Sequence, residues 1–109
     1  MIKKAILKIK HRKILKEMDL LEVSILTLDK YRQDVRGNRK ESLKMAEKKL
    51  KRNFVLGKKV GDDIVKYGNL EIFYDKNYII NVVNHRGKKR EFNIDGKLKK
   101  ELNIILDIE

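Results

Sequence analysis

Apolar residues spaced alternately four and three positions apart run through the first third of the chain and predict helix. The run is Leu7, His11, Ile14, Met18, Leu21, Ile25, Leu28, Arg32 and Val35, with no Pro or Gly between residues 2 and 36. It forms a heptad seam whose polar members are His11 and Arg32. Residues 19–22 fit a capping box, so either one long helix or two shorter helices satisfy the pattern. Because the seam is too apolar to face water, we predict a homodimer interface at Ile14, Met18, Leu21, Ile25 and Leu28.

A second helix is predicted from Arg39 to about Phe54, after a helix-ending Gly-Asn pair at residues 37–38. Its apolar face is Leu43, Ala46, Leu50 and Phe54. Cations four residues apart lie beside that face and repel one another, which favours an anionic partner that neutralises them. The predicted nucleic-acid-binding residues of this helix are Lys40, Lys44, Lys48, Lys51 and Arg52.

The hydrophobic period changes to two after residues 57–61. Strands are expected at 70–75 and 78–83, joined by a tight turn at residues 76–77, and a third strand at 91–94. Residues 63–67 can add a fourth. Asp95-Gly96 then leads into a last amphipathic helix that carries Leu98, Leu102 and Ile105. We therefore predict a single α+β domain, in which 1–56 are a basic helical part and 62–109 are an antiparallel meander with a C-terminal helix.

The charge distribution indicates a polyanionic partner. The 109 residues carry a net charge of +12, with 19 Lys/Arg and 7 Asp/Glu in residues 1–60 against 9 and 9 in residues 61–109. An excess confined to one half is typical of proteins that bind nucleic acid or an anionic membrane surface. Residues 2–18 place Ile2, Ala5, Ile6 and Ile9 among lysines, but apolar residues on the other sides of this segment favour packing, so we expect no membrane partner.

Catalytic and metal-binding patterns are absent from the sequence. There is no Cys, the two His residues lack metal-ligand spacing, and no phosphate loop or nucleophile elbow occurs. Asp62, Asp63, Glu71 and Asp75 lack the further elements of a magnesium nuclease. Lys8 and Lys10 interrupt any signal-peptide core, and no apolar run is long enough to span a bilayer. We expect a cytoplasmic, non-enzymatic protein with no cofactor.

The leading hypothesis is a DNA-binding regulator or accessory factor of a phage, plasmid or other mobile element. Frequent Lys, Ile and Asn, which have AT-rich codons, favour such a source. The basic helix and the hairpin loop 84–90 match the two binding parts of a winged-helix module, with phosphates bound by the helix. The loop adds Arg86, Lys88, Lys89 and Arg90 as secondary contacts. DNA is favoured over RNA because few aromatic side chains are free to stack on bases.

Two alternatives remain open. The first is a small protein-interaction inhibitor from a mobile element, with the heptad seam as its interface. The second comes from the segment "LEIFYDKNYIINVVNHRGKKREF", residues 70–92, which resembles the last strands of RelE/ParE-type toxins. The resemblance covers about a fifth of the chain. It implies a ribonuclease in which Tyr74, His85, Arg86 and Arg90 contact RNA, although the N-terminal strand of that family is not evident.

Overall fold

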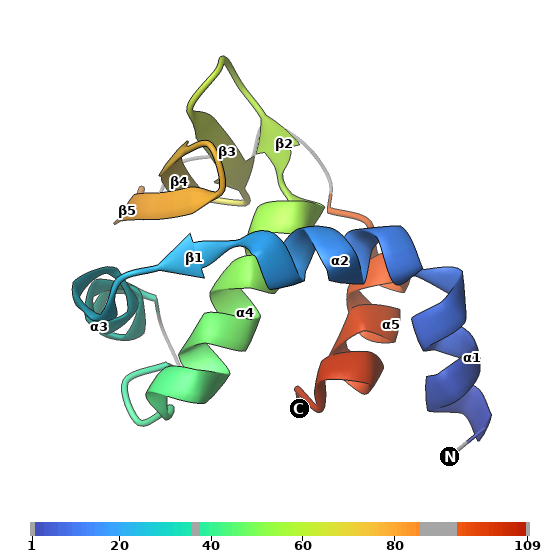
Figure 1. Ribbon diagram of the computed structural model, residues 1–109. Helices are drawn as coiled ribbons and strands as arrows, with labels where there is room; N and C mark the ends of the chain where they lie inside the picture. The colour runs from blue at the N-terminus through green and yellow to red at the C-terminus, as the bar shows by residue number, and fades with distance from the viewer. Residues whose placement is uncertain (1, 36–37, 86–93, 109) are drawn as a thin grey trace.

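The computed structural model describes residues 2–35, 38–85 and 94–108 and has an α+β fold, as the sequence predicted (Figure 1). Its helices are α1 (Ile2–Lys10), α2 (Arg12–Leu20), α3 (Ile25–Asp34), α4 (Leu43–Leu56) and α5 (Gly96–Leu106). Its strands are β1 (Glu22–Val23), β2 (Lys58–Lys59), β3 (Ile64–Tyr67), β4 (Leu70–Asp75) and β5 (Tyr78–Asn84).

The heptad region forms three helices and a strand, where the pattern had left one helix or two. The first break is at His11, which separates α1 from α2. The expected capping box at residues 19–22 is not used, because α2 continues to Leu20. The next helix instead begins after Ser24, whose hydroxyl accepts a hydrogen bond from the Thr27 backbone N–H. The segment between them joins the sheet, which a helical period could not reveal.

The sheet has the order β1-β5-β4-β3-β2, with β1 parallel to β5 and the other neighbours antiparallel. The predicted strands at 63–67, 70–75 and 78–83 and the turn at 76–77 are confirmed. The two-residue strands β1 and β2 were not foreseen. Of the expected strand at 91–94, residues 91–93 lie outside the described part of the chain, and Ile94 is not in a strand. A bulge between Phe73 and Tyr74 interrupts the alternation of β4.

Helix α4 lies at the centre of the molecule. It begins at Leu43, later than predicted, because Ser42 caps it through the Met45 N–H at 3.1 Å. In Figure 1 the sheet and α3 flank it on one side, α5 lies on the other, and α2 crosses in front. The main core joins α3, α4 and the sheet through Leu21, Leu28, Tyr31, Ala46, Leu50, Phe54, Val65, Leu70, Ile72, Ile79 and Val82.

A second, smaller core joins α1 and α2 to α5. Its buried members are Leu7, Leu102 and Ile105, with half-buried apolar side chains from α2 and from the end of α4 packed around them. The predicted C-terminal helix is therefore confirmed, with Asp95 as its N-cap. This second core places α1 at the end of the molecule farthest from α3 (Figure 1).

Candidate nucleic-acid interface

The cation row predicted on α4 does not form one exposed surface. Lys40 lies before the helix and is exposed, as is Lys44, whereas Arg52 is 7 % exposed. Successive positions four apart on an α-helix rotate by about 40° per step, because each residue turns the helix by about 100°. The row therefore drifts from the solvent side at Lys44 into the interior at Arg52. Arg52, which was predicted from the sequence to contact nucleic acid, is therefore buried in the fold and not part of the exposed surface.

The buried guanidinium of Arg52 is held by amide oxygens. Its Nε and Nη2 donate to Oδ1 of Asn53 at 3.1 and 2.9 Å, and Nη1 donates to Oδ1 of Asn103 at 2.8 Å. Asn53 in turn donates to the hydroxyl of Tyr31 at 3.2 Å. Burial raises the pKa of Tyr31, and the charge of Arg52 only partly opposes this rise. Arg52 therefore links α4 to α5 and, through Asn53, to α3.

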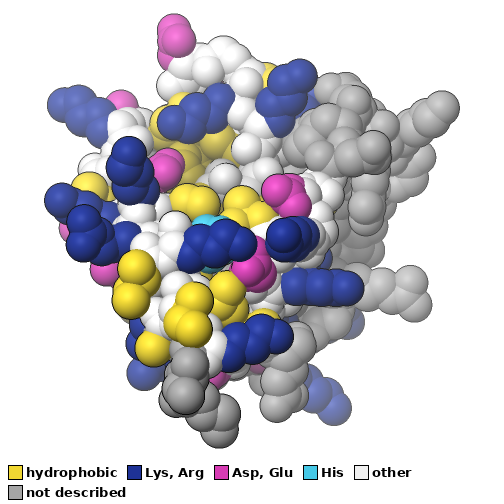
Figure 2. All heavy atoms as spheres, turned by 90° about the vertical axis from the view of Figure 1, so that its right-hand side faces the viewer, with side chains coloured by type: hydrophobic (Ala, Val, Ile, Leu, Met, Phe, Trp, Pro, Cys, Tyr) yellow, Lys and Arg dark blue, Asp and Glu magenta, His cyan; other side chains and the backbone are white. Residues whose placement is uncertain are grey.

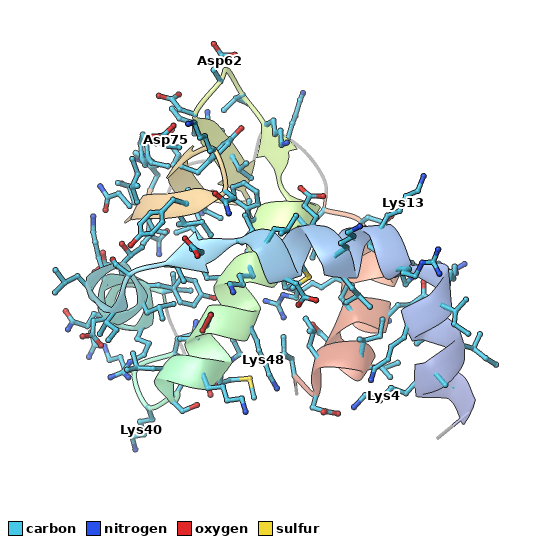
Figure 3. The ribbon with its side chains drawn as sticks, viewed as in Figure 1. Lys4, Lys13, Lys40, Lys48, Asp62 and Asp75 are labelled. Carbon is cyan, nitrogen blue, oxygen red and sulfur yellow. The ribbon has the colours of Figure 1, made fainter. Side chains whose placement is uncertain are left out.

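The other predicted lysines of α4 also make internal contacts. Lys48 Nζ donates to the backbone carbonyl of Leu106 at 2.9 Å, at the C-terminal end of α5, where a cation interacts favourably with the helix dipole. Lys51 forms an ion pair with Glu47 at 3.0 Å. Figure 3 shows Lys48 directed toward the end of α5, while Lys40 points away from the molecule. Only Lys40 and Lys44 of the predicted row are exposed.

Exposed cations concentrate instead on α1, the first turn of α2 and the start of α5. We call this surface the basic end and define it as Lys3, Lys8, Lys10, Arg12, Lys13, Lys97 and Lys100, all of which are exposed. Lys13 points away from the molecule in Figure 3. Figure 2, which looks onto the side where α1 lies, shows Lys and Arg side chains spread over this face. In the sequence, this surface could have been recognised from residues 2–10, which contain four lysines and no acidic residue.

Contacts with α5 hold the basic end together. Glu101 accepts hydrogen bonds from Lys10 at 3.3 Å, and its carboxylate lies 3.3 Å from Nε2 of His11. Lys97 is one turn before Glu101 on the same side of α5, which brings α5 cations next to the junction of α1 and α2. Burial raises the pKa of Glu101, but hydrogen bonds from His11 and Lys10 outweigh it, so the pKa lies below its usual range.

The far end of α5 makes a second connection to α1. Lys4 Nζ lies 2.9 Å from Oδ2 of Asp107, and this hydrogen bond, together with the lysine charge, lowers the pKa of the Asp107 carboxyl. Asp107 ends α5 in the left-handed conformation, with φ of 58°. Glu101 and Asp107 are thus both engaged with cations of α1. The outer cations Lys3, Lys8, Arg12 and Lys13 are not needed for these contacts.

The hairpin loop predicted as a secondary contact lies mostly outside the described residues, as do Arg86, Lys88, Lys89 and Arg90. At its start, Asn84 donates to the Asp34 carbonyl at 2.8 Å, and the His85 ring contacts the Glu71 carboxylate. Tyr74, which the toxin resemblance placed against RNA, packs edge-on against the Phe54 ring with centroids 4.9 Å apart.

Most of the residues predicted as a dimer interface contact other parts of the same chain. Met18, Leu21 and Leu28 are each 4 % exposed, and Ile14 packs against the second core. Ile25 is the exception, with 64 % of its surface exposed. A homodimer through this seam stays a prediction. Of the five residues predicted for its interface, Ile25 is the exposed one.

Metal-binding and membrane-spanning features are lacking in the part of the chain that the structure describes. No group of three or more His, Asp or Glu side chains gathers there in a way that could hold a metal ion. Asp62 and Asp75 lie at the sheet end of the molecule in Figure 3, away from the basic end. Among the described helices, none has the length and apolar character needed to cross a bilayer.

The fold and its charges define a small basic α+β protein built around a central helix. The chain belongs to the YorE family, whose model matches residues 21–104. This membership is consistent with the predicted origin of the protein from a phage or another mobile element. No curated protein and no solved structure matches the chain. Helices α1 and α2 precede the matched range, so much of the basic end lies outside it.

Proposed function

We propose that this protein binds nucleic acid, DNA in preference to RNA, through phosphate contacts at the basic end, and acts as a regulator or accessory factor of a phage or related element. The observation that carries the proposal is the group of exposed cations from α1, α2 and α5. Phosphate contacts supply most of the sequence-independent affinity of such proteins. The family membership supports the proposed source.

We propose the basic end as the binding surface in place of α4, because most of the predicted α4 cations are engaged within the chain. In a winged-helix module the recognition helix keeps one face free for the major groove. Helix α4 buries Ala46, Leu50, Arg52, Asn53 and Phe54, and the exposed cations left near its start are Arg39, Lys40 and Lys44. The basic end offers seven exposed cations, and it is the surface that we favour.

Salt dependence gives the first test of the mechanism. If five or so phosphates are neutralised, the logarithm of the binding constant should fall against the logarithm of salt concentration with a slope of about −4 to −5. Fluorescence anisotropy with a labelled duplex measures this slope. A slope near −1 contradicts the proposed mechanism.

A pair of charge-matched variants locates the surface. The triple variant Lys8→Gln, Arg12→Gln, Lys13→Gln should weaken binding by about tenfold or more and reduce the salt slope by about 2 to 3, because each lost cation releases one phosphate contact. The control triple variant is Arg39→Gln, Lys40→Gln, Lys44→Gln, which removes the same charge near the start of α4. We expect its affinity to stay within about twofold of the parent chain.

The two variants separate three outcomes. A larger loss in the control places the surface at the start of α4, as the sequence had predicted. Equal losses of affinity in the two variants indicate that the net charge of the chain, and not one particular surface, determines binding. No measurable binding of the parent chain to duplex DNA, single-stranded DNA or RNA overturns the proposal and favours the protein-interaction alternative. Circular dichroism spectra of both variants verify that the exposed substitutions leave the fold intact.

A further inference from the structure

Helix α1 carries two exposed isoleucines among its lysines. Ile6 is 57 % exposed and Ile9 is 76 % exposed, whereas Leu7 is buried against α5. Ile6 and Ile9 are three residues apart and so lie on one face of the helix. Lys3 and Lys10 are three and four residues from Ile6 and border the same face. Figure 2 shows apolar side chains gathered on this side of the molecule with Lys and Arg around them.

Phosphate contacts leave this arrangement unexplained. A nucleic-acid backbone satisfies the lysines but offers no apolar surface to the two isoleucines. A bilayer interface offers both, because headgroup phosphates lie directly above the acyl chains. Amphipathic helices that rest on membranes combine an apolar face with Lys and Arg in this way. We propose that α1 binds the surface of an anionic phospholipid membrane, with Ile6 and Ile9 entering between headgroups and Lys3, Lys10 and Arg12 at the phosphate level.

In the sequence, apolar residues on several sides of residues 2–18 favoured packing over membrane binding. The structure accounts for those on the sides away from Ile6 and Ile9. The apolar residues on these sides are Leu7, Ile14 and Leu15, and all three belong to the second core with α5. They are therefore already covered within the chain. Ile6 and Ile9 are not, and α1 lies at one extremity of the molecule, where a flat surface can reach it (Figure 1). The tertiary structure thus sorts one apolar segment into a packed face and an exposed face.

Charge complementarity identifies an anionic bilayer as the occupant. Helix α1 has four lysines and no acidic residue, and Arg12 and Lys13 follow directly. Polybasic segments are attracted to anionic headgroups, whereas a zwitterionic surface gives no such attraction. The inference is independent of nucleic-acid binding, although both proposals use cations of the basic end.

The start of α3 provides a matched control surface. Ile25 is 64 % exposed and Leu26 is 82 % exposed, so this pair is at least as accessible as Ile6 and Ile9. Its nearest charged neighbours in sequence are Glu22 and Asp29, so the lysine-rich setting of α1 is missing. If exposed aliphatic side chains alone caused membrane binding, both pairs would contribute equally.

The test is co-sedimentation of the full chain with vesicles of phosphatidylcholine alone and with vesicles that also contain phosphatidylglycerol. We expect partitioning only with phosphatidylglycerol. The double variant Ile6→Ser, Ile9→Ser should lower the partition coefficient by about tenfold or more, because apolar burial is lost while every cation stays. The double variant Ile25→Ser, Leu26→Ser should stay within about twofold of the parent chain.

Three results overturn the proposal. These are absence of partitioning with phosphatidylglycerol, equal effects of the two double variants, and full retention of partitioning by Ile6→Ser, Ile9→Ser, which would leave only diffuse charge attraction. Duplex affinity of the same variant is measured in parallel and should not change, since no phosphate contact is removed. Loss of DNA binding by the lysine variants therefore reports on the proposed function, and loss of vesicle binding by the isoleucine variant reports on this inference.

Discussion

Helices α1 and α4 are both rich in lysine, yet they differ in how many of their charges remain exposed. Helix α4 has five cations and one acidic residue, and α1 has four cations and none. In α4, Lys48, Lys51 and Arg52 contact groups within the chain. In α1, Lys4 and Lys10 pair with carboxylates of the α5 region, but Lys3, Lys8 and Lys10 are all exposed. The comparison teaches that a cationic helix is a candidate binding surface only where the fold leaves it at the periphery.

The largest expected contrast is in core packing. Leu50 of α4 is fully buried in the main core, so Leu50→Ala should lower the free energy of unfolding by about 3 to 5 kcal/mol. Leu7 of α1 is buried in the smaller second core, and Leu7→Ala should cost about 2 kcal/mol. Urea denaturation followed by circular dichroism measures both. Equal losses would show that α1 is as firmly integrated as α4.

The second contrast concerns two cations of α4 itself. Arg52→Gln removes the donors to Asn53 and Asn103 and leaves the buried amide oxygen of Asn53 without its partner, so we expect a loss of about 2 to 3 kcal/mol of stability. Lys44→Gln, at an exposed position, should change stability by no more than about 0.5 kcal/mol. The same denaturation experiment compares them. If Arg52→Gln were as mild as Lys44→Gln, Arg52 would be an accessible cation after all.

The smallest effect is the pH dependence of the contact between α1 and α5. The pKa of Glu101 is lowered in the folded chain from its ordinary 4.5. The stabilisation is therefore complete above that ordinary value and is lost as the pH falls through the folded pKa. The protection factors of the α1 amides, which correct for the intrinsic pH dependence of hydrogen exchange, should fall in that acidic range, and Glu101→Gln should remove this part of the pH dependence. Unchanged protection of α1 on acidification would contradict the role of Glu101.

Local patterns predicted several elements well. The apolar face of α4, the span of α5 from its Asp95 cap, and the turn at residues 76–77 all depend on residues within a few positions of one another. The break at His11 was missed, because the heptad continues through it without a Gly or Pro. The break near residues 19–22 was one of two alternatives, but the next helix begins after Ser24. Strand β1 was missed because two residues are too few to show the alternation of a strand. Its parallel partner, β5, is also more than fifty residues away in the sequence.

The sequence predicted the site at cations of residues 40–52 and of the loop 86–90, and none of these belongs to the basic end. The sequence located the excess charge in residues 1–60, and the structure agrees that exposed cations gather on helices from that half. The basic end also includes Lys97 and Lys100, which belong to the electrically neutral residues 61–109, because α5 packs beside α1. No charge count along the chain can reveal that meeting, because it depends on which helices share a core.

Residue order alone established an α+β chain, the apolar faces of its main helix and strands, and a surplus of positive charge suited to an anionic partner. Those properties follow from local periodicity and composition, which do not depend on distant contacts. The exposure of individual cations and isoleucines followed from the packing of α4 at the centre and of α1 at the edge. Burial is a property of neighbours in space, so Arg52 became an internal donor while Ile6 and Ile9 remained in contact with solvent.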